Sequence, residues 1–186
     1  MRKMYLSAPL PFVGQKRMLA KEFMKVLEQY PDGTLFVDLF GGSGLLSHIT
    51  KSLKPHSTVI YNDFDNYRFR MKHIPQTNQL LADIREMVGN SVPRHKIIKG
   101  ELRERIFSRI EQEENSTGYV DFITLSSSIL FSMKYKLSVQ DMRKEALYNN
   151  IRKTGYPECT DYLEGLEIVS CDYKEVFNRY KDIPGV

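Results

Sequence analysis

The sequence predicts an α/β fold built on a parallel β-sheet, and three observations support this prediction. Three short apolar stretches, residues 34–40, 57–63 and 166–172, each carry an aspartate at or near their end. Helical patterns alternate with these stretches, which is typical of parallel strands joined by crossover helices. A glycine-rich turn, "GGSG" at residues 41–44, follows the first stretch directly. In such sheets ligands bind beyond the carboxyl ends of the strands, where these features would gather.

The helices of this sheet are predicted from apolar periodicity. Residues 15–30 place apolar side chains at helical spacing and predict a helix before the first strand. Further helices are predicted over residues 45–53 and 173–180, after the first and third strands. The aspartates at the three strand ends are Asp38, Asp63 and Asp172. Each could be a helix N-cap, but three acids at one sheet edge beside a glycine turn favour a ligand site.

The chain between the second and third strands is too long for a simple crossover. Its patterns predict helices near 75–89 and 97–114, a buried helix over 119–133 and a more exposed helical segment over 139–153. We therefore expect a helical insertion at 68–165 that determines partner specificity. The sheet would then be built from residues 1–67 and 166–186.

Composition predicts a cytoplasmic protein and permits a polyanionic partner. The net charge is +4, and basic residues concentrate in residues 1–25, 67–73 and 93–100. Such patches suit nucleic acid, although a solvated surface explains them equally well. No apolar run reaches membrane-spanning length, and Cys159 and Cys171 lack metal or redox spacing. We expect neither a membrane nor a metal partner.

Two ligands compete for the glycine turn, a dinucleotide and S-adenosylmethionine. The dinucleotide-binding motif requires three glycines. Gly42 and Gly44 match the first two, but Ser47 occupies the position of the third. Asp63 could bind a ribose hydroxyl of either ligand. Asp38 disfavours a pyrophosphate and suits the cationic groups of S-adenosylmethionine, whose carboxylate could pair with Lys16. These residues favour S-adenosylmethionine.

The motifs "PLPFVGQKRML", "FVDLFGGSG" and "YNDFD" resemble, in order and spacing, the first half of the Dam-like adenine-specific DNA methyltransferases of bacteria and phages. The resemblance implies a Rossmann-like methyltransferase sheet, incomplete in this chain, that binds S-adenosylmethionine and acts on double-stranded DNA. It also implies that the insertion recognises the target sequence. The cofactor-binding residues that it implies are Phe12, Gly14, Lys16, Asp38, Gly41, Gly42, Ser43, Gly44, Asp63 and Asp172.

Polar residues in the second half of the insertion are candidates for DNA contact. Lysine, arginine and asparagine side chains bind phosphates and base edges in such interfaces. The same segments could instead supply packing and core residues. The candidates are Lys134, Lys136, Asn149, Arg152 and Lys153.

The family holds the target adenine nitrogen with a D-P-P-Y or related motif, and this sequence has eight prolines with no adjacent pair. We therefore expect no catalytic residue here and a chain that ends before the catalytic strand, inactive alone. It would self-associate or pair with a complementary C-terminal half. The alternatives are a non-enzymatic DNA-binding or cofactor-sensing module and, less favoured, a fragment of a dinucleotide-binding oxidoreductase.

Overall fold

The computed structural model describes residues 3–132 and 134–186, which form two compact units. Unit 1 runs to Met71 and resumes at Cys159, and unit 2 comprises Lys72–Glu158. The second boundary lies earlier than the expected residue 166. Tyr162 belongs to unit 1 because its ring stacks on His48 at 4.7 Å and its hydroxyl donates to the carbonyl of Ser43 at 3.1 Å.

Unit 1 contains a three-stranded parallel sheet, as the sequence predicts. The strands β1 (Phe36–Asp38), β2 (Val59–Asn62) and β5 (Glu167–Val169) pair in the order β1-β2-β5. All four residues of the central strand β2 are buried. Because the strands are parallel, their carboxyl ends share one edge of the sheet.

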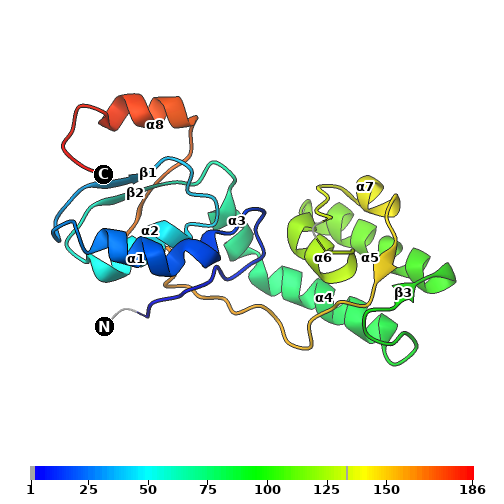
Figure 1. Ribbon diagram of the computed structural model, residues 1–186. Helices are drawn as coiled ribbons and strands as arrows, with labels where there is room; N and C mark the ends of the chain where they lie inside the picture. Colours follow the sequence, from blue (N-terminus) through cyan, green and yellow to red (C-terminus); the bar gives the residue numbers. More distant parts are fainter. Residues whose placement is uncertain (1–2, 133) are drawn as a thin grey trace. The chain divides into compact units, whose positions relative to one another are not determined.

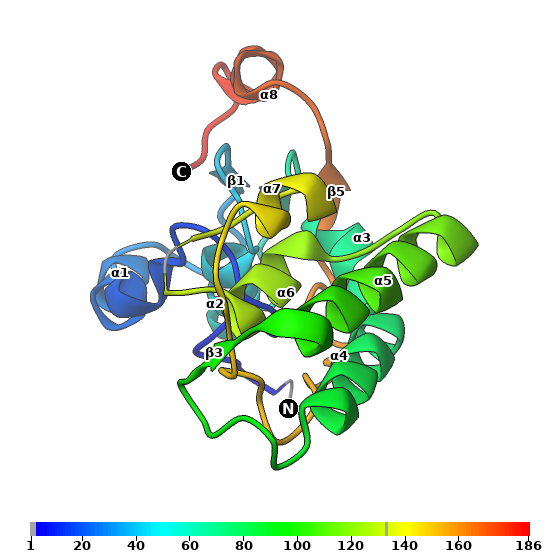
Figure 2. The ribbon, with the colours of Figure 1, turned by 90° about the vertical axis from the view of Figure 1, so that its right-hand side faces the viewer.

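The helices of unit 1 cover the sheet on both sides. A 3-10 helix, η1 (Lys16–Leu19), leads into α1 (Ala20–Leu27). Figures 1 and 2 show α8 (Tyr173–Tyr180) on the opposite side of the sheet from α1 and α2 (Leu45–Leu53). The remaining helix, α3 (Tyr67–Lys72), begins shortly after β2.

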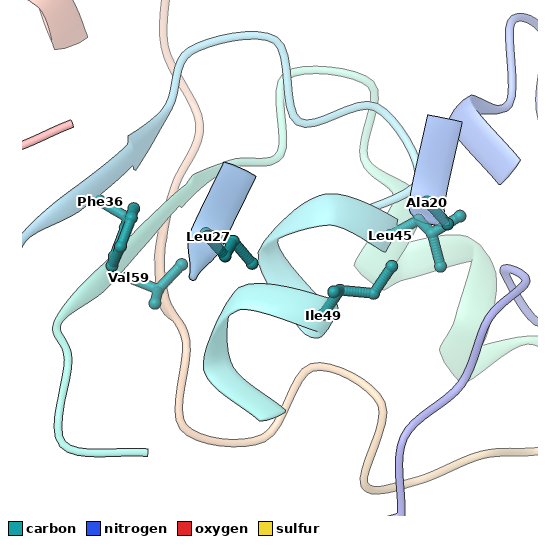
Figure 3. Packing of buried hydrophobic residues seen from close by; sticks show 6 residues of the cluster. All are labelled: Ala20, Leu27, Phe36, Leu45, Ile49 and Val59. Carbon is teal, nitrogen blue, oxygen red and sulfur yellow. The ribbon is translucent and has the colours of Figure 1, made fainter. Parts of the chain in front are cut away.

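A core cluster joins α1 and α2 to the sheet (Figure 3). It contains Ala20, Leu27, Phe36, Leu45, Ile49 and Val59. The predicted apolar face of the first helix is only partly correct, because Leu19 and Val26 are 58% and 46% exposed. The buried residues of α1 are those at its two ends, Ala20 and Leu27.

Unit 2 is mainly helical but also contains a small antiparallel sheet. Its helices are α4 (Ile74–Val88), α5 (Gly100–Thr117), α6 (Phe122–Ile129) and α7 (Val139–Arg143). Strands β3 (Ile97–Ile98) and β4 (Leu147–Tyr148) pair in antiparallel fashion. Figure 2 shows α4 and α5 side by side.

Three helix predictions for unit 2 are wrong in extent. Ile97 and Ile98, predicted as helical, form β3, and the helix begins only at Gly100. The segment predicted over 139–153 is helical only as far as Arg143, because the following residues pair with β3. The backbone amide of Asn149 extends this pairing by donating to the carbonyl of Lys96 at 2.9 Å.

The buried helix predicted over 119–133 is shorter at both ends. It begins after Asp121, whose carboxylate accepts from the backbone amide of Thr124 at 3.0 Å and from its hydroxyl at 2.8 Å. It ends at Ile129, and Leu130 has extended backbone geometry. Residue 133 lies outside the described residues.

Candidate functional site

A cavity of about 390 Å³ opens at the carboxyl ends of β1 and β2 in unit 1. Its position is the one where ligands bind in open parallel sheets. Four segments far apart in the sequence meet there: the turn before η1, the glycine turn after β1, the residues after β2 and the residues after β5. The lining residues are Phe12, Val13, Gly14, Lys16, Leu39, Phe40, Gly41, Gly42, Ser43, Leu45, Asn62, Phe64, Asp65, Asp172 and Tyr173.

The glycines of the turn are required by the packing of aromatic rings beneath them. A Cβ atom on Gly41 would lie 2.3 Å from ring atoms of Tyr61, which no side-chain adjustment of a fully buried tyrosine can relieve. A Cβ atom on Gly42 would lie 2.9 Å from the ring of Phe12, and Gly44 has a positive φ of 69°. The "GGSG" signal therefore has an explanation in packing as well as in ligand approach.

Tyr61 connects the glycine turn to the end of β2. Its hydroxyl lies 2.7 Å from the carbonyl oxygen of Gly42 and 3.0 Å from Oδ1 of Asp63. Burial, followed by the negative charge of Asp63, raises the pKa of Tyr61 far above its usual value. The hydroxyl therefore stays protonated and acts as a donor that holds the turn.

Asp63 does not line the cavity, although it was the predicted ribose-binding acid. Its carboxylate accepts from the backbone amides of Tyr67 at 2.6 Å and Arg68 at 3.0 Å, and so caps α3. The residue is only 4% exposed. Its place in this structure is therefore that of an acceptor for the first backbone amides of α3.

Asp38 also lies away from the cavity. Its Oδ2 accepts from the hydroxyl of Ser47 at 2.7 Å, which joins the end of β1 to α2. The residue lines a second, smaller hollow of about 160 Å³ that also includes Phe23, Val37 and Val186. This hollow is lined by residues of α1, α2, β1 and β2 together with Val186.

Three of the residues predicted to bind the cofactor, Phe12, Gly14 and Lys16, line the cavity. The Nζ of Lys16 donates to the carbonyl of Phe40 at 2.7 Å, so the ammonium group reaches from η1 to the residues after β1. The ring of Phe12 meets that of Tyr67 edge-on at 5.7 Å. The turn before η1 is thus fixed against both the first and the second strand ends.

Asp172 lines the cavity from the end of β5. Its Oδ1 caps α8 by accepting from the backbone amide of Lys174 at 2.8 Å. The next residue, Tyr173, contacts Phe40 with 5.1 Å between ring centroids. The three strand-end aspartates therefore do not form one site, and of the three only Asp172 lines the cavity.

Sequence reasoning missed Asn62, which holds the three strand ends together. Its amide nitrogen donates to the carbonyls of Leu39 at 3.1 Å and Cys171 at 2.9 Å, and its Oδ1 accepts from the amide of Cys171 at 3.2 Å. It also missed Phe64, Asp65 and Tyr173. The signal that could have found Phe64 and Asp65 is their position within "YNDFD", immediately after the strand.

In unit 2 the predicted DNA-contacting residues fall into two groups. Lys134 and Lys136 share one partner, Glu145, at 2.5 and 3.0 Å, and the Nδ2 of Asn149 donates to the carbonyl of Val92 at 2.6 Å. Arg152 and Lys153 are exposed in the loop after β4. The guanidinium of Arg152 lies 4.4 Å from the ring centroid of Tyr156.

Neither a membrane-spanning helix nor a metal cluster is found in the described residues. Within residues 3–132 and 134–186, no helix combines the length and apolar character needed to cross a bilayer. In the same residues no group of three histidine, cysteine or acidic side chains is arranged to hold a metal ion.

Two comparisons with known proteins agree with each other. A family model described as D12 class N6 adenine-specific DNA methyltransferase matches residues 12–158. A protein of Haemophilus influenzae described as "Putative methyltransferase" is 39% identical over 185 residues. The match covers 97% of this chain and 62% of that protein, so the chain spans less than two thirds of the relative's length.

Proposed function

We propose a function from the premise that this chain belongs to the D12 class N6 adenine-specific DNA methyltransferase family. The resemblance of its three motifs to adenine-specific DNA methyltransferases is thereby confirmed. Our proposal is that unit 1 binds S-adenosylmethionine, unit 2 contacts double-stranded DNA, and the reaction is methyl transfer to the exocyclic nitrogen of adenine.

The observation that carries the proposal is the cavity at the carboxyl ends of β1 and β2, because its charges match the cofactor. S-adenosylmethionine has an ammonium group, a sulfonium and a carboxylate. The cavity lining includes one cation, Lys16, and two carboxylates, Asp65 and Asp172. Opposite charges at short range favour binding. The cofactor supplies the methyl group when bound.

The aromatic lining suits the cofactor's adenine ring. Phe40 and Phe64 are 64% and 62% exposed, and Tyr173 is 42% exposed. Large apolar rings left open beside a cavity are typical of a binding site rather than of a monomer's ordinary surface. Covering them with a planar base would remove apolar surface from water.

We further propose that these 186 residues do not transfer the methyl group without another polypeptide segment. The sequence contains no pair of adjacent prolines, and therefore no D-P-P-Y motif to hold the target nitrogen. Transfer to adenine requires that the base be rotated out of the duplex and held in line with the methyl group. The segment that provides this motif would complete the cavity.

The edge of β1 that does not pair with β2 is where that segment would add a strand. The amide of Val186 donates to the carbonyl of Leu35 at 2.8 Å, and its carbonyl accepts from the amide of Val37 at 2.7 Å. These two bonds follow the pattern of a parallel strand beginning beside β1. The apolar hollow next to it would receive side chains of such a strand. Until it is paired, this edge favours self-association.

The test combines binding and activity. Calorimetry with S-adenosylmethionine should give saturable binding to the 186-residue chain. Radiolabelled cofactor and duplex DNA should give no labelled adenine with the chain alone, and labelled adenine once the C-terminal part of the Haemophilus influenzae relative is added. Tight binding of NAD in place of S-adenosylmethionine would favour the dinucleotide alternative. Binding without activity in any combination would favour a sensing module.

A further inference from the structure

One buried histidine of unit 1 lies outside the cavity lining. His48 is on α2 and is 0% exposed. Its ring lies between two segments that are far apart in the sequence, the N-terminal segment at Tyr5 and the segment that returns to unit 1 at Tyr162. The ring is parallel to that of Tyr162 within 13° and contacts that of Tyr5 with 5.3 Å between centroids. His48 therefore joins α2 to both segments.

The two hydrogen-bond partners of the His48 ring determine its protonation state. Nδ1 lies 2.7 Å from the carbonyl oxygen of Tyr162, and because a carbonyl only accepts, the hydrogen is on Nδ1. The backbone amide of Tyr5 donates to Nε2 at 2.9 Å, so Nε2 presents its lone pair. A proton on Nε2 would place two donors face to face. The bond from Tyr5 to His48 therefore exists only while the ring is neutral.

The two tyrosines that contact His48 do not compete with it for the proton. The hydroxyl of Tyr5 donates to Oδ1 of Asp161 at 2.8 Å, and this bond, followed by burial, raises the pKa of Tyr5 far above its usual value. Burial raises the pKa of Tyr162 in the same way. Both hydroxyls therefore stay protonated, and histidine is the residue type that normally changes charge between pH 5 and 8.

Other titratable and polar groups surround this cluster. The Nζ of Lys3 lies 4.7 Å from the ring centroid of Tyr5, and Cys159 also raises the pKa of Tyr5. From α3, the ring of Tyr67 approaches that of Tyr162 with 6.5 Å between centroids. On α2 itself, the hydroxyl oxygen of Ser52 lies 3.4 Å from Nε2 of His48. This oxygen gives a protonated Nε2 an acceptor in place of the Tyr5 amide.

The two segments that His48 joins both lead to the cavity. The N-terminal segment continues to Leu10, whose amide donates to the hydroxyl of Tyr67 at 2.8 Å, and it reaches the cavity lining at Phe12. On the other side, the hydroxyl of Tyr162 donates at 3.1 Å to the carbonyl of Ser43, a residue of the glycine turn that lines the cavity. A change at His48 can therefore reach the cavity through both segments.

We propose that the bond between the Tyr5 amide and His48 is a proton-sensitive latch, which holds the N-terminal segment on unit 1 while the ring is neutral and releases it when Nε2 is protonated. His48 is thereby a positioning residue for the cavity. The latch follows from the contacts of His48 alone, whereas its effect on a ligand rests on the proposed function of the cavity.

Hydrogen exchange of the Tyr5 amide, followed by NMR on the 186-residue chain and corrected for the intrinsic exchange rate, measures release. The neutral ring makes the bond, so the latch is closed at high pH and opens as pH falls. Because a histidine in water titrates near pH 6.5, the corrected rate should rise about tenfold between pH 7.5 and pH 5.5.

Two glutamine variants locate the proton. In His48→Gln the side-chain oxygen can accept from the Tyr5 amide but does not titrate, so the corrected rate should not change with pH. The matched control is His56→Gln, because the side chain of His56 is 86% exposed, and it should keep the pH dependence of wild type. A pH dependence that persists in His48→Gln would overturn the inference.

A measurement on wild type does not depend on the folding of His48→Gln, which also removes the donor to Tyr162. At pH 7.5 the nitrogen-15 shifts of the His48 ring should show a hydrogen on Nδ1 and a lone pair on Nε2. The opposite tautomer, or a charged ring at this pH, would also overturn the inference.

S-adenosylmethionine distinguishes the latch from the function of the cavity. If the ligand binds only when the N-terminal segment is in place, a concentration ten times its Kd should slow exchange at Tyr5 by up to about tenfold. Saturable binding without slower exchange would show that His48 does not position the cavity. If no S-adenosylmethionine binds, the proposed function of the cavity fails, and the pH comparison still decides the latch.

Discussion

In unit 1 the polar side chains near the strand ends bond mainly to backbone groups, whereas in unit 2 the charged side chains bond mainly to one another. Asn62, for example, connects the ends of all three strands through backbone groups. In unit 2, Glu145 pairs with two lysines and Arg109 pairs with both Asp83 and Glu113. Polar residues at strand ends can therefore be interpreted directly as parts of a site. Charged residues in a basic stretch can be interpreted as ligand contacts only after the ion pairs that they form within the protein are known.

The ion pairs and hydrogen bonds within unit 2 reduce the number of residues available to contact DNA. Of the five predicted DNA-contacting residues, Lys134 and Lys136 share the single carboxylate of Glu145, and the side chain of Asn149 donates to the carbonyl of Val92. Arg152 and Lys153 are exposed. Of these five residues, the exposed pair in the loop after β4 is therefore the better candidate for phosphate contact.

The largest expected effect comes from placing a side chain beneath the glycine turn of unit 1. Gly41→Ala should lower the free energy of unfolding by about 2–3 kcal/mol, because the new Cβ overlaps the ring of Tyr61. In unit 2, Gly118→Ala meets no atom within 4 Å and costs only the strain of its positive φ, about 1 kcal/mol. Chemical denaturation of both variants measures the difference. Equal losses would show that packing under the turn is not what requires Gly41.

A smaller effect on stability but a large one on binding is expected for Lys16. Its ammonium group lies at the cavity, so Lys16→Met should weaken S-adenosylmethionine binding about ten- to a hundredfold. Lys21→Met is the matched control, since this lysine is exposed on α1 and does not line the cavity. Calorimetry of the two variants decides whether the effect depends on place or only on total charge.

Much of unit 1 could be predicted from sequence because each strand is a short apolar stretch followed by a turn residue. The order of the motifs indicated the cavity, and Lys16 and Asp172 line it as expected. The places of Asp38 and Asp63 could not be predicted from the sequence. Capping and ligand binding require the same residue type at the same place, and only the direction of the side chain distinguishes them.

Unit 2 was harder to predict because its short elements depend on contacts between distant residues. Nothing local in "KIIKG" or "EALYNN" distinguishes a two-residue strand from a helical turn. Ile97 and Ile98 form a strand because Leu147 and Tyr148 pair with them. The ion pairs of Glu145 likewise join residues about ten positions apart, so the apparent basic patch could not be corrected from sequence.

The two groups of basic residues in unit 2 should differ in how they affect the salt dependence of DNA binding. Replacing both Arg152 and Lys153 with alanine should reduce the slope of log affinity against log salt by up to about 1.8, since each phosphate contact contributes about 0.9. Replacing both Lys134 and Lys136 should change the slope less, because these two lysines share an ion pair with Glu145. Fluorescence anisotropy with a labelled duplex gives both slopes. A larger change in the second variant would reverse the assignment.

The smallest expected effect is the pH dependence contributed by Glu145. Hydrogen bonds from Lys134, then from Lys136, hold its pKa below the usual value of 4.5. A carboxyl group with a lowered pKa in the folded state stabilises the protein above the unfolded value, and this contribution is lost as pH falls through the folded value. As the pH falls below 5, the free energy of unfolding of wild type should therefore decrease slightly more than that of Glu145→Gln. Urea denaturation at a series of pH values measures this difference. The loss should be slight because ion pairs near the protein surface contribute little to stability, and 0.5 M salt should reduce it further. An equal pH dependence of the two proteins would mean that the two lysines are not held by Glu145 in solution, and they would then return to the set of candidate DNA contacts.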